Sequence, residues 1–227
     1  MDVVYVVGEH TEELRYSLRS LRNVEHDRVW IVGSRPAWAT DVGIIEVGDQ
    51  WEKARNITDK VYAAASHPDV SDPFAYFNDD FFALAPAEIP NRHRGKVDVK
   101  RPRGHHNQRL SLKESRLWTF WHLRETWGID PVISYDLVHT PMMIDKAGLV
   151  AAVDASRRVK LLAPQVRSLY GNLQGVGGEE GPNAKLGHAK DTVGSRVWVS
   201  TNVISWNGKA GEEIRALFPD PSPYERI

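Results

Sequence analysis

Two adjacent carboxylates, Asp79 and Asp80, follow an apolar run at residues 74–77 and the polar residue Asn78. The run has the length and composition of a buried strand, so the two acids stand where that strand ends. Side chains of neighbouring strand residues point to opposite faces, but a turn at the strand end can direct one carboxylate into a crevice. Carboxylate oxygens are ligands that Mg²⁺ and Mn²⁺ prefer, and these ions also bind phosphate groups. Asn and Asp also favour plain turns, so the spacing alone leaves both a metal site and a turn open.

Two side chains later in the chain could take part in proton transfer and phosphate binding. His139 stands among apolar residues, two positions before Pro141. An imidazole near neutral pH can accept a hydroxyl proton or bind a phosphate oxygen. Arg167 begins a polar, Gly-rich stretch, and a guanidinium group binds phosphate oxygens in pairs and stabilises charge that develops during transfer. The alternatives are a hydrogen-bonded turn histidine and a solvated surface arginine.

The elements that must position these residues alternate between strand and helix over the first 80 residues. Apolar, β-branched runs predict strands at residues 3–7, 28–32, 42–47 and 74–77. The spacing of apolar residues predicts helices at residues 11–21 and 52–66. This alternation predicts an α/β fold with a mostly parallel sheet. In such sheets ligands bind beyond the carboxyl ends of the strands, so Gly8 and residues 78–80 are expected to line one crevice.

The rest of the chain has a looser pattern. Residues 91–109 are rich in Arg, Lys, His, Gly and Pro and are expected to form an exposed loop, and the Gly-rich segment 167–178 is expected to be irregular. Alternation predicts a strand at 196–200, and helical spacing predicts helices at 113–127, 146–153 and 212–218. No linker or repeat separates these parts, so residues 1–227 are expected to form one domain.

The composition excludes several classes of site and function. The chain has 227 residues, of which 41% are apolar, and its formal net charge of −1 argues against a nuclease or other nucleic-acid-binding protein. Because it contains no cysteine, disulfides, thiolate metal sites and a cysteine nucleophile are excluded. The N-terminus does not resemble a signal peptide, and no apolar run reaches the roughly 18 residues of a membrane span. A cytoplasmic protein without a membrane span is therefore expected.

Several segments resemble, in the right order, the conserved blocks of the Stealth family of sugar-phosphate transferases. Residues 139–146 match a His-x-Pro motif that is followed by an apolar pair and Asp-Lys, and residues 167–168 match the Arg-Ser that comes after it. The matching segments extend over nearly the whole chain: residues 2–5, 13–21, 74–82, 138–146, 167–168 and 217–225.

The resemblance implies a Rossmann-like α/β fold related to the glycosyltransferase-A fold, with a mixed sheet flanked by helices. It implies transfer of a hexose-1-phosphate from a nucleotide sugar, expected to be a UDP-sugar, to a hydroxyl group of a glycan or protein acceptor. Asp79 and Asp80 would hold Mn²⁺ or Mg²⁺. The catalytic residues would be Asp80, His139 and Arg167.

The resemblance also divides the chain into a half that binds the nucleotide sugar, residues 1–90, and an acceptor and catalytic half, residues 91–227. Arg15 and Arg19 lie four residues apart on one helix face, from which at least one could reach the nucleotide or the acid pair. The alternative is a solvated face paired with neighbouring glutamates. Helix starts favour anions, which draws attention to the start of the helix at 52–66. The candidates for the nucleotide-sugar site are Val7, Gly8, Arg15, Arg19, Arg55, Asn56 and Asn78.

Two alternative functions remain open. The family pattern has a second histidine where this chain has Met142, and an Asn-Asp pair where this chain has Thr201 and Asn202. With these departures, the chain could be a glycosyltransferase of the glycosyltransferase-A type that moves the sugar itself to a protein or glycan. The third hypothesis is a non-catalytic module that binds a nucleotide or a carbohydrate.

Overall fold

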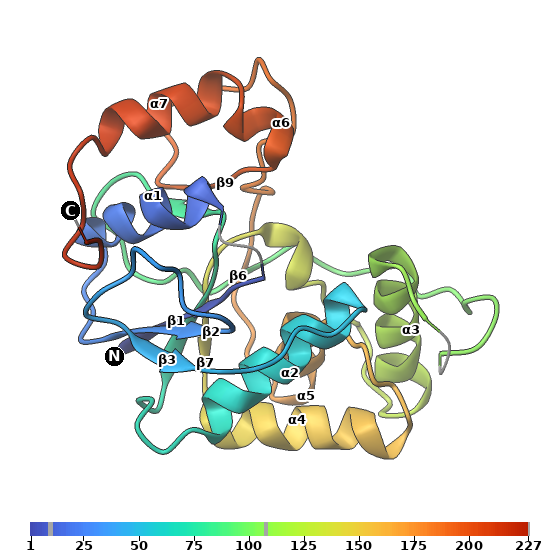
Figure 1. Cartoon of the computed structure of the whole chain (residues 1–227). Coiled ribbons are helices and arrows are strands. Elements are labelled where there is room, and N and C mark those ends of the chain that lie inside the picture. The colour runs from blue at the N-terminus through green and yellow to red at the C-terminus, as the bar shows by residue number, and fades with distance from the viewer. Residues whose placement is uncertain (9–10, 107–108, 227) are drawn as a thin grey trace.

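The computed structural model describes residues 1–8, 11–106 and 109–226 and shows a five-stranded mixed sheet between layers of helices (Figure 1). The strand order is β3-β2-β1-β4-β7, in which the first four strands are parallel and β7 is antiparallel to β4. The bounds are β1 (Asp2–Val6), β2 (Val29–Val32), β3 (Gly43–Ile45), β4 (Phe74–Asn78) and β7 (Met142–Ile144). The expected α/β class and its flanked, mixed sheet are therefore confirmed.

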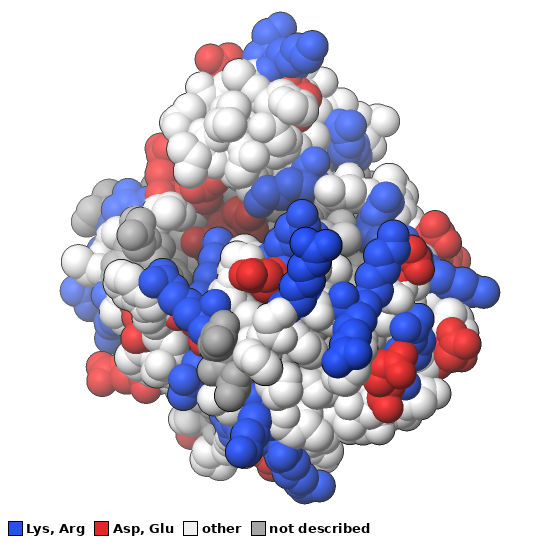
Figure 2. Space-filling view, turned by 90° about the vertical axis from the view of Figure 1, so that its right-hand side faces the viewer, with Lys and Arg blue, Asp and Glu red and all other residues white. Residues whose placement is uncertain are grey.

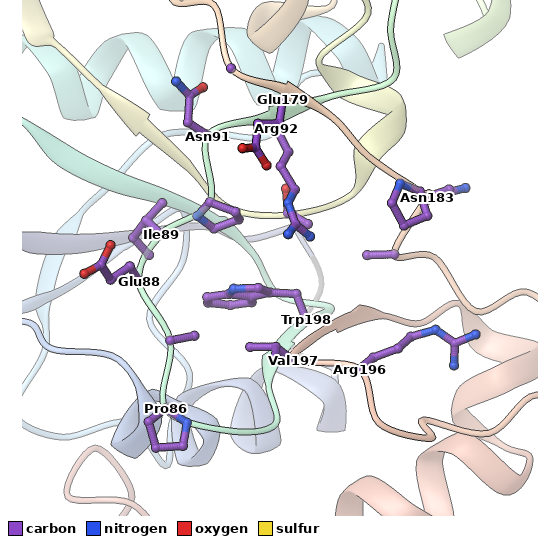
Figure 3. A pocket seen from close by; sticks show the side chains of 16 residues that line it. Pro86, Glu88, Ile89, Asn91, Arg92, Glu179, Asn183, Arg196, Val197 and Trp198 are labelled. Atoms are coloured by element: carbon purple, nitrogen blue, oxygen red, sulfur yellow. The ribbon is translucent and has the colours of Figure 1, made fainter.

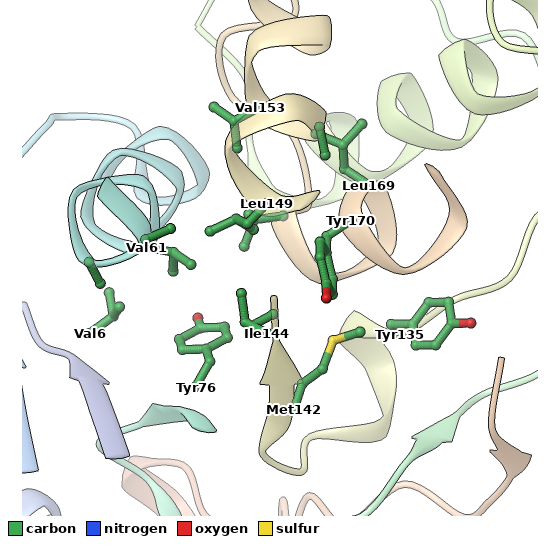
Figure 4. Close-up of a cluster of buried hydrophobic side chains, with 14 of the residues drawn as sticks. Val6, Val61, Tyr76, Tyr135, Met142, Ile144, Leu149, Val153, Leu169 and Tyr170 are labelled. Atoms are coloured by element: carbon green, nitrogen blue, oxygen red, sulfur yellow. The ribbon is translucent and has the colours of Figure 1, made fainter. Parts of the chain in front are cut away.

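Both faces of the central strands are buried, which explains why they are continuous apolar runs in the sequence. Side chains alternate along β1, so Val3 and Tyr5 join one core cluster while Val4 and Val6 join the other. The first cluster packs against α1 (Glu12–Ser20). The second packs against helices α2 (Lys53–Ser66), α4 (Lys146–Arg158) and α5 (Val166–Leu173), and Figure 4 shows several of its side chains between the sheet and these helices.

A smaller layer lies beyond the carboxyl end of β4. There β5 (Phe81–Ala83) pairs antiparallel with β9 (Trp198–Ser200), and α6 (Val203–Trp206) and α7 (Lys209–Leu217) pack on this pair through a third apolar cluster. A second small sheet joins β6 (Arg92–His93) to β8 (Glu179–Glu180). The remaining elements are α3 (Leu112–Glu125) and the 3₁₀ turns η1 (Leu21–Asn23) and η2 (Asp136–Val138).

Helix α5 corrects the expectation that residues 167–178 are irregular. Val166, Leu169 and Tyr170 follow helical spacing and are buried in the core. Gly171 lies inside the helix because the ring of Tyr135 packs there: a Cβ at this position would be 2.6 Å from the ring. The glycine that suggested a loop is therefore a packing requirement.

Other boundaries differ by smaller amounts. The predicted strand at 196–200 is shortened to β9, helix α4 continues past residue 153 to Arg158, and the last helix begins at Lys209. The predicted loop at 91–109 contains the short strand β6, and its residues 107 and 108 lie outside the described residues. None of the described helices is long and apolar enough to cross a membrane.

Candidate functional site

The turn between β4 and β5 carries the two carboxylates. Asp79 and Asp80 form this turn directly after the parallel pairing of β4 with β1 ends at Asn78. The pairing of β5 with β9 places the turn next to Ser200, and the amide of Thr201 donates a hydrogen bond to the carbonyl of Asp80 (3.2 Å). Two sheets therefore fix the backbone of the acid pair at the position where α/β sheets bind ligands.

One oxygen of Asp80 is engaged and the other is not. Its Oδ2 forms an ion pair with Lys185 and accepts a hydrogen bond from Ser200 Oγ (3.2 Å). Its Oδ1 is buried and has no hydrogen-bond partner among the residues that the structure describes. Buried polar atoms are nearly always satisfied, so this oxygen is a candidate ligand for a bound cation or substrate.

Asp79 lies in a cluster of carboxylates. Burial raises the pKa of Asp79 to about 7, with further contributions from the negative charges of Asp80 and Glu13, while Lys53 opposes the shift. Burial also raises the pKa of Glu13, which accepts a hydrogen bond from Thr201 Oγ1 (3.0 Å). Burial is thus the largest cause of both shifts and the charges of the neighbouring acids add to it, an environment in which a divalent cation would stabilise the ionised carboxylates.

The His139 imidazole is held in one orientation. His139 follows the 3₁₀ turn η2 and has a φ of 53°. Its Nδ1 lies 2.8 Å from Asn183 Oδ1 and 3.2 Å from the carbonyl of Leu137. The amide of Lys185 donates to the same Asn183 oxygen (2.9 Å), which identifies that oxygen as an acceptor. Both partners of Nδ1 accept, so Nδ1 carries the hydrogen and Nε2 keeps a lone pair.

The charge state of His139 suits a proton acceptor. Burial lowers the pKa of His139, and the nearby Arg167 and Lys185 cations lower it further, whereas the hydrogen bond with Asn183 opposes this. The imidazole is therefore neutral near pH 7, as a general base must be.

Arg167 is a buried cation in the first turn of α5. Its side chain is 6% exposed, its Nη1 donates to the carbonyl of Thr140 (2.9 Å), and its Nε lies 3.6 Å from Asp136 Oδ1. The guanidinium group also lies over the rings of Tyr76 and Phe81, with centroid distances of 5.5 and 5.3 Å. These contacts fix a positive charge that does not have to reorganise when an anion binds.

The structure brings Asp80, His139 and Arg167 to one cavity of about 260 Å³. Asn78 also lines it, and its Oδ1 accepts a hydrogen bond from the hydroxyl of Tyr76 (2.8 Å). The cavity lies at the N-terminal ends of α2 and α3. Figure 2 views the face of the molecule that carries α3 and shows a hollow with acidic side chains on its floor and Lys and Arg side chains around it. The lining includes four basic residues, Lys53, Arg116, Arg167 and Lys185, and two acidic ones, Asp80 and Asp136. This excess of positive charge favours an anionic ligand such as a phosphate ester.

The start of α2 carries three candidate residues, Lys53, Arg55 and Asn56, and contributes only the first of them to the cavity. Lys53 lines the cavity, whereas Arg55 pairs with Asp59 within the helix (3.6 Å) and Asn56 donates to Asp49 (3.0 Å), and neither Arg55 nor Asn56 lines it. The sequence thus indicates the correct helix end, but the direction of each side chain depends on where the first turn begins.

Arg15 and Arg19 do not line the cavity either. Arg19 makes two hydrogen bonds of 2.8 Å to the carboxylate of Glu225 and a third to the carbonyl of Phe218, so it fastens the C-terminal segment. Arg15 lies over the ring of Trp38 at 4.7 Å. Arg19 does not reach the acid pair, because the buried carboxylate of Glu225 binds its guanidinium group.

Val7 and Gly8 lie at the carboxyl end of β1, beside the same edge of the sheet. The carbonyl of Val7 accepts a hydrogen bond from the buried ammonium group of Lys60 (2.6 Å), and Gly8 is exposed with open space where a Cβ would be. Neither residue lines the cavity itself.

Two side chains that organise the site, Asn183 and Lys185, were not predicted from the sequence. Both lie in a segment that is rich in Gly and Pro and has no helix or strand periodicity. They approach the acid pair and His139 through an isolated bridge between Lys185 and Ser200, which is a long-range contact without a local sequence signal.

The acid pair fits a divalent cation in part. Among residues 1–8, 11–106 and 109–226, no group of three or more His, Asp or Glu side chains is arranged to hold a metal ion. Mg²⁺, however, is usually bound by one or two carboxylates together with substrate phosphates and water. Of the two acids, Asp80 lines the cavity and has the unpartnered Oδ1, whereas Asp79 is not among the residues that line it, so the fit depends on Asp80.

Comparison of the chain with models of known protein families finds no match, and comparison with curated proteins finds none either. The assignment of a function therefore depends on the geometry of the site.

Proposed function

We propose that this chain is a metal-dependent transferase that moves a sugar-1-phosphate from a nucleotide sugar to an acceptor hydroxyl. One observation carries the proposal: Asp80, His139 and Arg167 line a single cavity in which basic residues outnumber acidic ones. A free carboxylate oxygen, a neutral imidazole and a buried guanidinium group can serve phosphoryl transfer as a metal ligand, a general base and a phosphate-binding group.

In the proposed reaction the acceptor oxygen attacks the phosphorus atom that carries the sugar. The bond between that phosphorus and the bridging oxygen of the pyrophosphate breaks, and the nucleoside monophosphate leaves with the bonding electrons. The acceptor proton moves to Nε2 of His139, whose Nδ1 hydrogen is already held by Asn183. With a UDP-sugar the products are UMP and a sugar-1-phosphate diester of the acceptor.

The remaining residues position and stabilise the charges. Arg167 stabilises the negative charge that develops on the transferred phosphoryl group, and Lys53 and Lys185 add positive charge at the cavity wall. Asp79 and Asp80 would hold Mn²⁺ or Mg²⁺, which when bound would neutralise the pyrophosphate. The resemblance to the Stealth family, and the glycosyltransferase-A-like fold that this resemblance implies, agree with this scheme.

A second candidate is a glycosyltransferase, in which the acceptor attacks the anomeric carbon and the nucleoside diphosphate leaves. One observation favours it. Met142, which stands where the family pattern has a second histidine, is a buried core residue in β7, so the position supplies no imidazole.

Identification of the released nucleotide separates these functions. The protein is incubated with a UDP-sugar, Mn²⁺ and a glycan or protein acceptor, and the nucleotides are separated by chromatography. UMP is expected; UDP would indicate the glycosyltransferase, and metal-independent binding without turnover would indicate the non-catalytic module. Asp80→Asn should lower the rate of metal-dependent turnover at least about a hundredfold, because it removes a charge at the reacting centre. The control Asp98→Asn changes a carboxylate that is 78% exposed and should leave the rate unchanged.

A further inference from the structure

A second cavity, of about 760 Å³, adjoins the proposed catalytic cavity and is the larger of the two. Three chain segments border it: residues 86–92, 178–184 and 196–198 (Figure 3). In Figure 3 Trp198 lies in the middle of the cavity, with Ile89 on one side, Asn183 on the other and Arg92 extending towards the centre. Its volume lies in the range of sites that bind small molecules.

The two cavities share a border at His139. His139 lines the smaller cavity. The larger one is lined by the next residue, Thr140, and by Asn183, the hydrogen-bond partner of His139. Thr140 also accepts the hydrogen bond from Arg167 through its carbonyl. A molecule in the larger cavity would therefore lie against the backbone and side chains that hold the proposed base and the proposed phosphate-binding arginine.

The charged side chains of the larger cavity balance one another. Four charged residues line it, Arg92, Arg196, Glu88 and Glu179, so their formal charges sum to zero, and in Figure 3 Arg92 points towards the centre whereas Glu88 and Arg196 point outwards. Among the described residues, the side chains of Arg92, Glu88 and Glu179 form no hydrogen bond or ion pair, whereas Arg196 donates to the carbonyls of Thr192 (2.8 Å) and Val193 (3.1 Å). A phosphate group or a polyamine would meet a repelling pair of charges, whereas a hydroxyl group can accept from a guanidinium and donate to a carboxylate.

The apolar part of the lining completes the complement to a sugar. Ile89, Val197 and Trp198 present apolar surface next to the free donors and acceptors, together with three prolines, Pro86, Pro90 and Pro182. The side-chain amides of Asn91 and Asn183 offer further hydrogen-bonding groups. A neutral saccharide has this combination of hydroxyl groups at its edge and C–H groups on its faces.

We infer that the larger cavity binds the acceptor and that the acceptor is a neutral oligosaccharide. The inference rests on the proposed function, because it assigns the molecule that delivers the attacking hydroxyl. The hydroxyl next to the Asn183 and Thr140 wall is the one that transfers its proton to His139.

Binding can be tested separately from turnover with three neutral trisaccharides: maltotriose, chitotriose and mannotriose. Saturation-transfer NMR detects binding and NMR titration gives the Kd. At least one trisaccharide should bind to the wild-type protein, and Arg92→Ala and Glu179→Ala should each raise the Kd about tenfold to a hundredfold, the usual effect of losing a hydrogen bond to a charged group. Arg103→Ala and Glu46→Ala remove the same side-chain types at exposed positions outside the cavity and should leave the Kd unchanged.

The results also separate this inference from the proposed function. Absence of binding by all three trisaccharides overturns the inference, as does a Kd that responds equally to the cavity variants and the controls. If UMP is still released from a UDP-sugar in that case, the proposed function stands without the inference. If trisaccharide binds and depends on Arg92 and Glu179 but no nucleotide is ever released, the saccharide site stands and the transferase does not. Asp80→Asn should retain trisaccharide binding, since Asp80 lines only the smaller cavity.

Discussion

The imidazole of His139, which is hydrogen-bonded to Asn183, should determine the pH dependence of the proposed reaction through its pKa. A general base acts in its neutral form, so activity should fall as pH decreases through the pKa of the imidazole. Burial and the neighbouring cations lower that pKa, so the acid limb of kcat/KM should lie below the ordinary histidine value of about 6.5. His139→Gln should remove the limb together with most of the activity, whereas His188→Gln, at an exposed histidine outside the cavity, should change neither.

Asn183 should affect this base without touching the phosphate. In Asn183→Ala the imidazole loses the acceptor that keeps the hydrogen on Nδ1, and we expect kcat to fall about tenfold, which is less than the roughly hundredfold or more that general-base catalysis contributes, because the base itself is still present. Asn183→Asp keeps an acceptor at the same place and should recover much of the loss. The matching measurement is KM for the nucleotide sugar, which should change little. A change in KM alone would contradict the positioning role.

Asp79 should make the metal-free protein less stable as pH rises. Its pKa in the folded protein is about 7 against an ordinary value of 3.8, so the folded state holds a proton that the unfolded state has already released between these values. Stability from this group is therefore greatest below about pH 4 and is lost as pH rises towards 7.

Asp79→Asn mimics the protonated acid and should raise the free energy of unfolding at pH 8 by about 1–3 kcal/mol, with little effect at pH 4. Urea unfolding with EDTA present measures both values, and Asp98→Asn is the exposed control. An equal change at both pH values would contradict a raised pKa of Asp79 in the folded protein.

At the scale of helices and strands, the sequence predicted the elements that depend on local pattern. The runs at β1, β2 and β4 are buried on both faces, and their composition is sufficient to identify them. The position of Asp79 and Asp80 at a strand end followed directly. Helix α5 did not follow, because Gly171 and the polar residues around Arg167 suggested a loop.

What the sequence could not predict depends on contacts between distant segments. Lys53 points into the cavity and Arg55 away from it, and these directions depend on the residue at which the first turn of α2 begins. The approach of Asn183 and Lys185 depends on the pairing of β9 with β5, which brings residues more than a hundred positions apart into contact. No local periodicity encodes either contact.

Gly171 provides a test of the packing that the local pattern concealed. Alanine favours a helix over glycine by about 1 kcal/mol, so Gly171→Ala would stabilise α5 if local propensity decided the outcome. A Cβ there would instead lie 2.6 Å from the Tyr135 ring. Overpacking typically costs about 1–3 kcal/mol, so we expect a net loss of about 1 kcal/mol in chemical denaturation. In a Tyr135→Ala background the same substitution should be neutral or stabilising, and a loss of equal size there would exclude the ring as the cause.

At the scale of the whole molecule, the proposed site joins segments from both halves of the chain, and the C-terminal segment closes back onto the first helix. The carboxylate of Glu225 binds Arg19, and backbone hydrogen bonds join Tyr224 to Thr40 and Arg226 to Trp38. The resemblance-based expectation placed Arg19 at the nucleotide sugar, whereas these contacts give it a structural role. Substitution of Arg19 should therefore affect stability, whereas substitution of Arg167 should affect catalysis.

Arg19→Met should lower the free energy of unfolding by about 3 kcal/mol, because it leaves Glu225 buried without its partner. Glu225→Gln in the same chain should recover part of this loss by removing the unpaired charge. At a temperature where the variant remains folded, its KM and kcat for the nucleotide sugar should match those of the wild-type protein, since Arg19 does not line the cavity. Arg167→Met should instead reduce kcat at least about a hundredfold, even in protein that circular dichroism shows to be folded. If Arg19→Met instead raised KM for the nucleotide sugar without loss of stability, the donor site would extend to the helix α1 face, and the division between a structural and a catalytic arginine would be wrong.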